Sequence, residues 1–176
     1  MVKVRVAHTA DLGAGTLAAA RALLEDAFED LDDSDWDHAL GGVHAVVRLD
    51  GAVIGHAAVV QRRLLHGGRT LRAGYVEGVA VRADQRRRGY AAAMMAALEE
   101  VVRGAYDLGA LSATDEGAAL YTARGWQRWS GPTFALTPTG VRRTAEDDGG
   151  VHVLPVTRPL DLTGELTCDW RDGDLW

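Results

Sequence analysis

A predicted strand that runs directly into an arginine- and glycine-containing loop constrains this chain more than any other feature. Residues 74–81 read Gly-Tyr-Val-Glu-Gly-Val-Ala-Val, residues 86–91 read Arg-Arg-Arg-Gly-Tyr-Ala, and a helical pattern follows. The first N–H groups of a helix have no partner within it and carry the positive end of the helix dipole. Three arginines add charged donors, and the small residues Gly89 and Ala91 let an anion approach the backbone. The loop therefore suits phosphate binding; a basic loop that merely caps a helix is the alternative.

The hydrophobic periodicity of the whole chain predicts an α+β fold with a mixed, mostly antiparallel central sheet flanked by helices. Helices are predicted from Thr16, as N-cap, to about Phe28, over 90–104 and from Asp115 to Arg124, where Gly125 stops the helix. Strands are predicted at 2–6, 43–49, 52–66, 70–81, 107–113, 126–130, 133–136, 151–156 and 166–170. We expect 126–130 to pair with 133–136, 29–42 to be a loop or short helix, and 137–150 to be a loop.

The length and composition predict one folded domain over residues 1–176. Hydrophobic residues make up 47% of the 176 residues, enough to bury a core. No apolar run reaches the roughly 18 residues of a membrane span, so no membrane partner is expected. Cys168 is the single cysteine, and Met1–Arg5 leads into a strand pattern, so we expect a cytoplasmic protein. The histidines lack metal-ligand spacing, so no metal site is expected.

Charge is distributed unevenly along the chain, whose formal net charge is −6. Eight acidic residues and no basic residue lie between positions 25 and 37, whereas arginines gather at 62–72 and 82–88. Such a division suits two ligands of opposite sign, an anionic cofactor and a cationic substrate. For any single run, an ordinary solvated surface is the simpler interpretation. The negative balance argues against nucleic acid as the main partner.

Several longer segments resemble the aminoglycoside 2'-N-acetyltransferases, a family within the GNAT acetyltransferases. The segments that carry the resemblance are Asp-Trp at 35–36, Gly-Tyr-Val-Glu-Gly-Val-Ala-Val-Arg-Ala-Asp at 74–84, Arg-Gly-Ala-Tyr-Asp-Leu-Gly-Ala-Leu-Ser at 103–112, Leu-Tyr-x-x-Arg-Gly-Trp at 120–126 and Cys-Asp-Trp-Arg-x-Gly-Asp-x-Trp at 168–176. The loop at 86–91 also matches the Arg-x-x-Gly-x-Ala spacing of the GNAT pyrophosphate loop. The resemblance implies the GNAT fold, acetyl-CoA as co-substrate, and transfer of acetyl to the 2'-amine of an aminoglycoside in a ternary complex. It also implies a homodimer and antibiotic resistance.

The resemblance further implies which residues bind the cofactor. The backbone of Val79 and Val81 would pair with the pantetheine amides, and the N–H of Val79 would polarise the thioester carbonyl. The pyrophosphate would be cradled by Arg86, Arg87, Arg88, Gly89, Tyr90 and Ala91.

Acetyl transfer to an amine needs a base for the amine and an acid for the departing thiolate. Glu77 is the only carboxylate of its predicted strand, and the resemblance implies that it is the general base, acting through water. Tyr121 matches the GNAT tyrosine that acts as general acid. A Glu77 that only binds substrate and a Tyr121 that is only structural are the alternatives.

A substrate with several ammonium groups calls for carboxylates as partners. The resemblance implies substrate contacts from Asp35, Glu77, Ser112, Asp147, Asp174 and Trp176, including the α-carboxylate of Trp176. Simple anchoring of the tail by its indole is the alternative for Trp176. For Trp36 and Trp126, core packing is preferred to ligand stacking.

Two other functions remain open from the sequence. One is a GNAT enzyme acting on another amine, such as a cell-wall amino sugar, a thiol-cofactor precursor or a polyamine. The other is a non-catalytic protein that binds cationic drugs, which the presence of both Glu77 and Tyr121 argues against.

Overall fold

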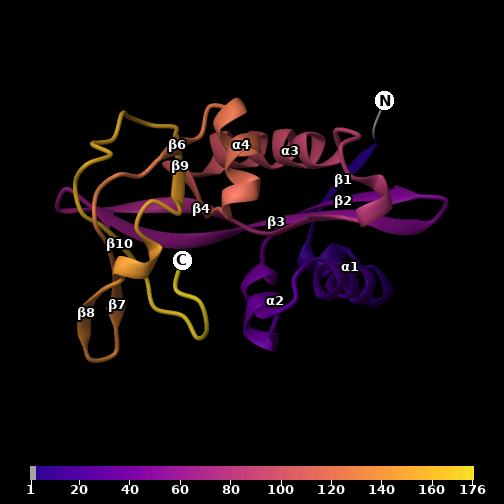
Figure 1. The fold of residues 1–176 in the computed structure, drawn as a ribbon, viewed down its shortest axis with the longest axis horizontal. Coiled ribbons are helices and arrows are strands. Elements are labelled where there is room, and N and C mark those ends of the chain that lie inside the picture. The colour runs from indigo at the N-terminus through magenta and orange to yellow at the C-terminus, as the bar shows by residue number, and fades with distance from the viewer. Residues whose placement is uncertain (1–2) are drawn as a thin grey trace. The chain divides into compact units, whose positions relative to one another are not determined.

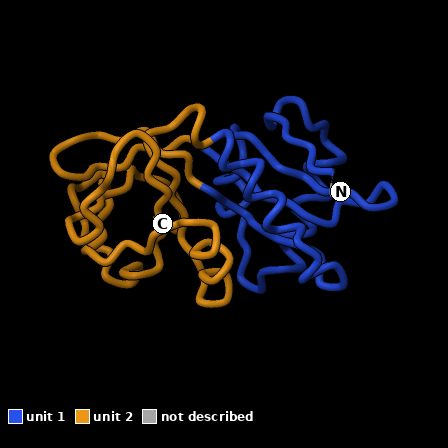
Figure 2. Tube along the Cα trace, turned by 90° about the horizontal axis from the view of Figure 1, so that it is seen from above, with its two compact units in different colours: residues 1–60, 76–101 blue, residues 61–75, 102–176 orange. Residues whose placement is uncertain are grey.

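The computed structural model describes residues 3–176; Met1 and Val2, where the first predicted strand begins, lie outside the described residues. The chain divides into two compact units (Figure 2). Unit 1 comprises residues 1–60 and 76–101, and unit 2 comprises residues 61–75 and 102–176. Two long strands, β3 (Ala52–His66) and β4 (Arg69–Val81), contribute residues to both units.

Unit 1 is a small sheet with helices on both faces (Figure 1). β1 (Val4–His8) pairs antiparallel with β2 (Val43–Leu49), which pairs antiparallel with the first part of β3. Helices α1 (Ala14–Ala27) and α2 (Asp33–Ala39) cover one face, and α3 (Tyr90–Ala105) covers the other. Two short 3-10 turns, η1 (Thr9–Asp11) and η2 (Ala83–Gln85), follow β1 and β4.

Apolar side chains fill both interfaces of unit 1. Leu24 of α1 and Trp36 of α2 belong to the buried cluster on the first face. On the second face, Met94 is fully buried and its sulfur would lie 3.1 Å from a Cβ on Gly55. Gly55 therefore lets α3 pack closely onto β3, as the apolar side of a predicted amphipathic helix requires.

The core of unit 1 also contains a pair of histidines. His44 of β2 and His56 of β3 are fully buried, and their rings are joined by a hydrogen bond of 2.9 Å between His44 Nδ1 and His56 Nε2. Burial, followed by the neighbouring His56 and His8, lowers the pKa of His44 from 6.5 to about 4. Burial also lowers the pKa of His56. Both rings are therefore neutral at neutral pH.

Unit 2 is a mixed sheet with strands on both sides of the β3–β4 hairpin. On the β4 side, β5 (Leu108–Ser112) pairs parallel with β4, β9 (Val151–Pro155) antiparallel with β5, and β6 (Gln127–Arg128) antiparallel with β9. On the β3 side, β10 (Leu166–Cys168) pairs antiparallel with β3, β7 (Thr133–Thr137) parallel with β10, and β8 (Gly140–Arg143) antiparallel with β7. Unit 2 also contains α4 (Asp115–Ala123) and the turn η3 (Ala145–Asp147). The predicted mixed, mostly antiparallel sheet flanked by helices is confirmed.

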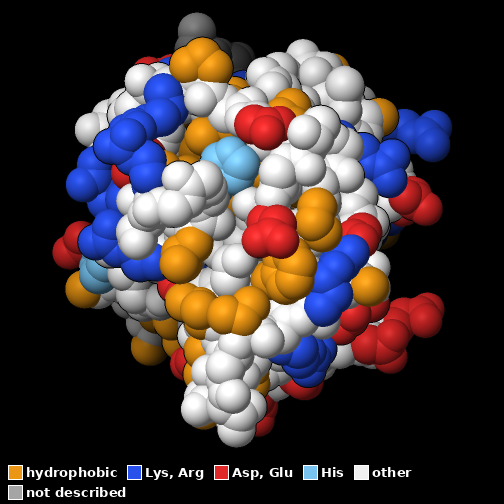
Figure 3. Space-filling view, turned by 90° about the vertical axis from the view of Figure 1, so that its left-hand side faces the viewer, with side chains coloured by type: hydrophobic (Ala, Val, Ile, Leu, Met, Phe, Trp, Pro, Cys, Tyr) orange, Lys and Arg blue, Asp and Glu red, His pale blue; other side chains and the backbone are white. Residues whose placement is uncertain are grey.

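Strand β8 forms an edge of this sheet and is exposed along its length. Arg142 pairs with Glu146 at 3.0 Å, and Arg143 pairs with Asp148. Figure 3 shows charged side chains of both signs interspersed with hydrophobic ones on the side of the molecule that it displays. Charged residues on an edge strand discourage pairing with another chain.

Three local predictions are wrong. Strand β6 pairs with β9 and not with 133–136, and the predicted loop at 137–150 contains β8. The backbone between the two segments turns away, because Ser130 N–H and Gly131 N–H both donate to Leu162 O, each at 2.9 Å. Helix α1 begins at Ala14 with Gly13 as N-cap, and the Thr16 hydroxyl accepts a hydrogen bond from Arg48 at 2.7 Å instead.

Replacing Gly131 by alanine should destabilise the protein. A Cβ at this position would collide with the backbone carbonyl oxygen of Gly164 and lie 2.5 Å from that of Thr163, and backbone cannot move aside as a side chain can. We expect a loss of about 2 kcal/mol in the free energy of unfolding, measured by urea denaturation. Gly104→Ala is the matched control, because a Cβ there meets nothing within 4 Å on helix α3. The control should be neutral or stabilising; equal losses in both variants would contradict the packing argument.

The buried histidines should make stability depend on pH. The unfolded chain binds protons below its histidine pKa of about 6.5, whereas folded His44 stays neutral down to about pH 4. The free energy of unfolding should therefore fall as the pH drops from 7 to 5, by up to about 1.4 kcal/mol per pH unit from His44. Urea denaturation at several pH values measures the slope. His44→Asn should be less stable at pH 7 but have a shallower slope; an unchanged slope would refute the assignment.

Candidate active site

The predicted phosphate loop in unit 1 has the backbone of an anion-binding turn. Arg87 has φ +61° and Gly89 has φ +83°, so two residues of the loop adopt the left-handed conformation. Loop residues 86–89 are exposed, and helix α3 begins at Tyr90. A Cβ on Gly89 would meet nothing within 4 Å, so the space beside this backbone is open. The turn presents unpaired helix N–H groups beside arginine side chains, which suits a pyrophosphate.

The arginines around this loop are not equivalent. Arg82 binds Asp84, with 2.6 Å between Arg82 Nε and Asp84 Oδ1, and Gln85 donates to the same carboxylate at 3.0 Å. The Arg82 guanidinium, ahead of Gln85, holds the pKa of Asp84 at about 2. Arg86 Nε donates to Val81 O at 3.3 Å, which folds the start of the loop back onto the end of β4. Arg82 is thus already neutralised, whereas Arg87 and Arg88 are exposed to solvent.

The end of β4 offers backbone groups for a further ligand. Arg82 N–H donates to Ile54 O of β3 at 2.8 Å, so Arg82 and Ala80 face β3. Because strand residues alternate, the backbone groups of Val79 and Val81 face the opposite edge. Strand β4 pairs with β5 at Ala73, Gly74 and Tyr75, which precede Val79 and Val81 in the strand.

Glu77 lies just before a bulge in β4. It is partly buried, and the next residue, Gly78, has φ +57°. A left-handed glycine within a strand is the backbone signature of a β-bulge, where the regular alternation of side chains is interrupted. We infer such a bulge here and call it the Gly78 bulge. The carbonyl of Gly78 accepts a hydrogen bond of 2.8 Å from His56 Nδ1.

Asp35 lies in the first turn of α2, in the same unit as Glu77 and the phosphate loop. Its Oδ2 accepts from Asp32 N–H at 3.0 Å, and Asp32 Oδ1 accepts from Asp35 N–H at 3.0 Å, a reciprocal capping box. The next residue, Trp36, packs its ring 5.9 Å from that of His56. Asp35 therefore has a structural role as well as any role in binding. Trp36 is buried core, as predicted.

Tyr121 lies on α4 in unit 2. Its side chain is buried, and the centroids of the Trp126 and His152 rings lie 6.2 and 6.5 Å from that of its own ring. Burial raises the pKa of Tyr121 to about 12. The phenol therefore stays protonated at neutral pH, as a hydrogen-bond donor or acid must. Trp126 is buried core, as predicted.

Three predicted substrate residues of unit 2 lie on neighbouring segments. Ala113 N–H, next to Ser112, donates to Gly150 O at 3.0 Å, and Gly150 N–H donates to Asp147 O at 3.0 Å. Partial burial, followed by the charges of Glu146 and Asp174, raises the pKa of Asp147. The negative charges of these carboxylates repel one another, and together they attract a cation.

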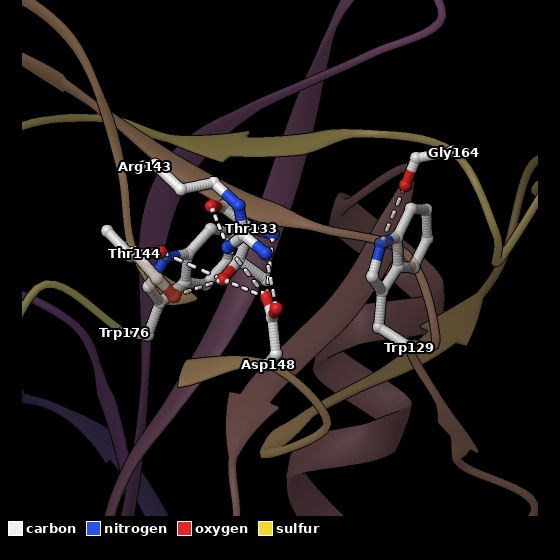
Figure 4. Close-up of polar contacts among 7 residues, drawn as sticks. All are labelled: Trp129, Thr133, Arg143, Thr144, Asp148, Gly164 and Trp176. Carbon is white, nitrogen blue, oxygen red and sulfur yellow. Dashed lines mark hydrogen bonds and ion pairs between the residues drawn. The ribbon is translucent and has the colours of Figure 1, made fainter. Parts of the chain in front are cut away.

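Trp176 is anchored by a network of buried hydroxyls (Figure 4). Its indole Nε1 donates to Thr144 Oγ1 at 3.0 Å, and Thr144 donates to Thr133 Oγ1 at 2.8 Å. Asp148 accepts from Thr133 and Arg143, and the Arg143 guanidinium holds the pKa of Asp148 at about 2. The indole thus anchors the tail.

The sequence did not reveal the partners that hold these groups. The Gly78 bulge had a signal, a glycine within a valine-rich strand, that could have been interpreted as a bulge. The His44–His56 pair and the network of Thr144, Asp148 and Trp176 had none, because side-chain contacts between strands and with the tail depend on how the elements pack.

Two features are missing from the part of the chain that the structure describes. No group of three or more His, Cys, Asp or Glu residues there lies where it could hold a metal ion. Among residues 3–176, no helix is long and apolar enough to span a membrane.

Known proteins share this fold and much of this sequence. The acetyltransferase (GNAT) domain family matches residues 11–129. The aminoglycoside 2'-N-acetyltransferase of Mycolicibacterium fortuitum is 57% identical over 177 aligned residues, covering 98% of this chain and 91% of that protein.

Solved structures agree in fold. The GNAT family N-acetyltransferase YhbS of Escherichia coli in complex with CoA has a TM-score of 0.64 at 19% identity, over 94% of this chain and 88% of that one. A GCN5-related N-acetyltransferase from Kribbella flavida has a TM-score of 0.61 at 19% identity, over 74% of this chain. This chain spans 34% of the length of the Kribbella protein. The family match over residues 11–129 and the 57% identity over almost the whole chain together place this protein among the aminoglycoside 2'-N-acetyltransferases of the GNAT family.

Proposed function

We propose that this protein transfers the acetyl group of acetyl-CoA directly to the 2'-amine of aminoglycosides in a ternary complex, which confers resistance to these antibiotics. The observation that carries the proposal is the 57% identity to the enzyme of that name from Mycolicibacterium fortuitum. The acids of both units support a substrate with several ammonium groups, since carboxylates attract and bind cations.

The residues of unit 1 fit acetyl-CoA, which supplies the acetyl group as a thioester. The turn of Arg86, Arg87, Arg88, Gly89, Tyr90 and Ala91 would hold the pyrophosphate with backbone N–H groups and guanidinium groups. The outward-facing backbone of Val79 and Val81 would pair with the amides of the pantetheine arm. The open space beside Gly89 supports this fit, because a side chain there would narrow the approach to the backbone.

Glu77 is the proposed general base. Its position beside the Gly78 bulge takes its side chain out of the regular alternation of β4. Glu77 acts through a water molecule that it polarises toward the amine, as a carboxylate acting as general base can.

Tyr121 is the proposed general acid. Its pKa of about 12 keeps the proton on the phenol until negative charge develops on the departing sulfur. The packing of Trp126 and His152 around the ring fixes its orientation.

The proposed substrate contacts are the residues that the sequence resemblance implies. Asp35 and Glu77 belong to unit 1, and Ser112, Asp147, Asp174 and Trp176 belong to unit 2. Partial burial and the raised pKa of Asp147 support a role in binding an ammonium group, because a cation would relieve the repulsion from Glu146 and Asp174.

We further propose that residues 1–176 act as one catalytic domain, as a homodimer in the cytoplasm. The family match over 11–129 takes in parts of both units, which supports one domain. Cys168 is buried and unpaired with another cysteine, which suits a reducing compartment. Sedimentation of the purified protein measures the oligomeric state.

The regiochemistry should separate this function from its alternatives. We expect CoA release with acetyl-CoA and an aminoglycoside that has a free 2'-amine, and none with a close analogue that has a 2'-hydroxyl. Thiol release measures turnover, and mass spectrometry of the product places the acetyl group. Equal turnover of both would retain the acetyltransferase but reject the 2'-amine. No turnover of either aminoglycoside, together with turnover of a polyamine or an amino sugar, would favour a different amine substrate.

Replacing Tyr121 by phenylalanine should lower kcat by about 100-fold while the fold is retained. The change removes only the hydroxyl that donates the proton. Steady-state kinetics measure kcat, and thermal unfolding checks the fold. Tyr106→Phe is the matched control, because Tyr106 packs against Gly74, outside the candidate site residues. A Tyr121→Phe enzyme with normal kcat would exclude Tyr121 as the acid, and protection of cells without turnover would favour drug binding alone.

A further inference from the structure

A chain of hydrogen bonds runs through the core of unit 1 and ends on the backbone of β4. Thr9 Oγ1 lies 2.7 Å from His44 Nε2, and His44 Nδ1 lies 2.9 Å from His56 Nε2. His56 Nδ1 lies 2.8 Å from the carbonyl oxygen of Gly78. Both imidazoles are fully buried, whereas Thr9 at the start of this series of hydrogen bonds is partly exposed.

The carbonyl of Gly78 sets the direction of every hydrogen bond in this chain. A carbonyl oxygen only accepts, so the hydrogen of neutral His56 lies on Nδ1 and its Nε2 accepts from His44 Nδ1. His44 Nε2 in turn accepts from the Thr9 hydroxyl, whose oxygen is held by Gly41 N–H at 2.9 Å. Because the last acceptor has no proton to pass on, the chain holds an atom in place and does not relay protons.

The atom that this series of hydrogen bonds holds is the carbonyl oxygen of Gly78, in the bulge beside Glu77. An ordinary strand carbonyl lies in the plane of the sheet and bonds to a neighbouring strand, whereas this one bonds to a side chain. A Cβ on Gly78 would lie 3.0 Å from Leu24 Cδ1 and 3.4 Å from His56 Nδ1. His56 is therefore packed between the bulge and the ring of Trp36, 5.9 Å away.

The two residues that flank Gly78 are the proposed base, Glu77, and the proposed oxyanion donor, Val79. The Gly78 carbonyl and the Val79 N–H belong to one planar peptide group, so a rotation of that group would turn the Val79 N–H, and the accompanying change in the backbone dihedrals of Gly78 would shift the adjoining Glu77. We propose that His56 is a positioning residue whose Nδ1–H, oriented by His44 and Thr9, holds the Gly78 bulge in the conformation that acetyl transfer requires. The inference rests on the proposed roles of Glu77 and Val79.

Two variants separate the two nitrogens of His56. In His56→Asn, the side-chain amide lies near the place of Nδ1 and can still donate to Gly78 O. In His56→Gln, the amide reaches the place of Nε2 and keeps the contact with His44 but not the donor to Gly78. Both variants lose the ring, so both should have a lower Tm. We expect kcat to fall by about 10- to 100-fold in His56→Gln but only a few-fold in His56→Asn, with similar KM values for the aminoglycoside.

A second readout does not depend on turnover. The ¹³C chemical shift of the Gly78 carbonyl, measured by NMR, should change in His56→Gln and stay close to that of the unaltered protein in His56→Asn. If the unaltered protein has no aminoglycoside turnover, the proposed function fails, and this shift still decides whether His56 holds the bulge.

His66 provides the matched control. Its Nδ1 makes the same kind of bond, 2.9 Å from Glu165 O, and both residues belong to unit 2, whereas Gly78 belongs to unit 1. His66→Asn and His66→Gln should have equal kcat and leave the Gly78 shift unchanged. Equal kcat and equal Gly78 shifts in the two His56 variants would overturn the proposal and leave His56 with a packing role alone.

Discussion

The backbone hydrogen bonding of β4 is the constraint on which the rest of the structure depends. In unit 2 the strand is paired with β5 through Ala73, Gly74 and Tyr75, which fixes it as an interior strand. In unit 1 it departs from regular strand geometry at Gly78, and its last residues present backbone groups away from β3. A strand that was regular throughout would alternate its side chains strictly and offer no redirected carboxylate.

Energetically, the departure at Gly78 is offset by specific contacts. A carbonyl turned into a core without a partner would cost about 1–3 kcal/mol. His56 supplies that partner, and His44 and Thr9 fix the hydrogen positions of His56. The same principle operates in unit 2, where Thr144 satisfies the indole of Trp176 within the buried network. In each unit, buried polar groups therefore hold a segment in place beside proposed functional residues.

The charged residues fall into two groups, those that pair with each other and those proposed to bind ligands. Asp84 neutralises Arg82 at the base of the phosphate loop, and Asp148 neutralises Arg143 beside the tail. The charged groups proposed to bind ligands are others, namely the exposed arginines of the loop and the acids around Asp147. Counting charges along the sequence could not separate these two classes, because pairing depends on which side chains meet in the fold.

The sequence by itself determined the long central hairpins, the helix after the arginine loop and the stop of α4 at Gly125. These depend on local periodicity and on turn residues, so β2 and β3 were predicted with the bounds that the structure has. The pairing of 126–130 was predicted wrongly, because a strand selects its partner by packing against distant segments, here β9. For the same reason, only the tertiary structure decided the bulge at Gly78, the histidine chain that holds it and the anchoring of Trp176. These features require atoms from segments far apart in the chain to meet in a dry core, and no local pattern encodes that meeting.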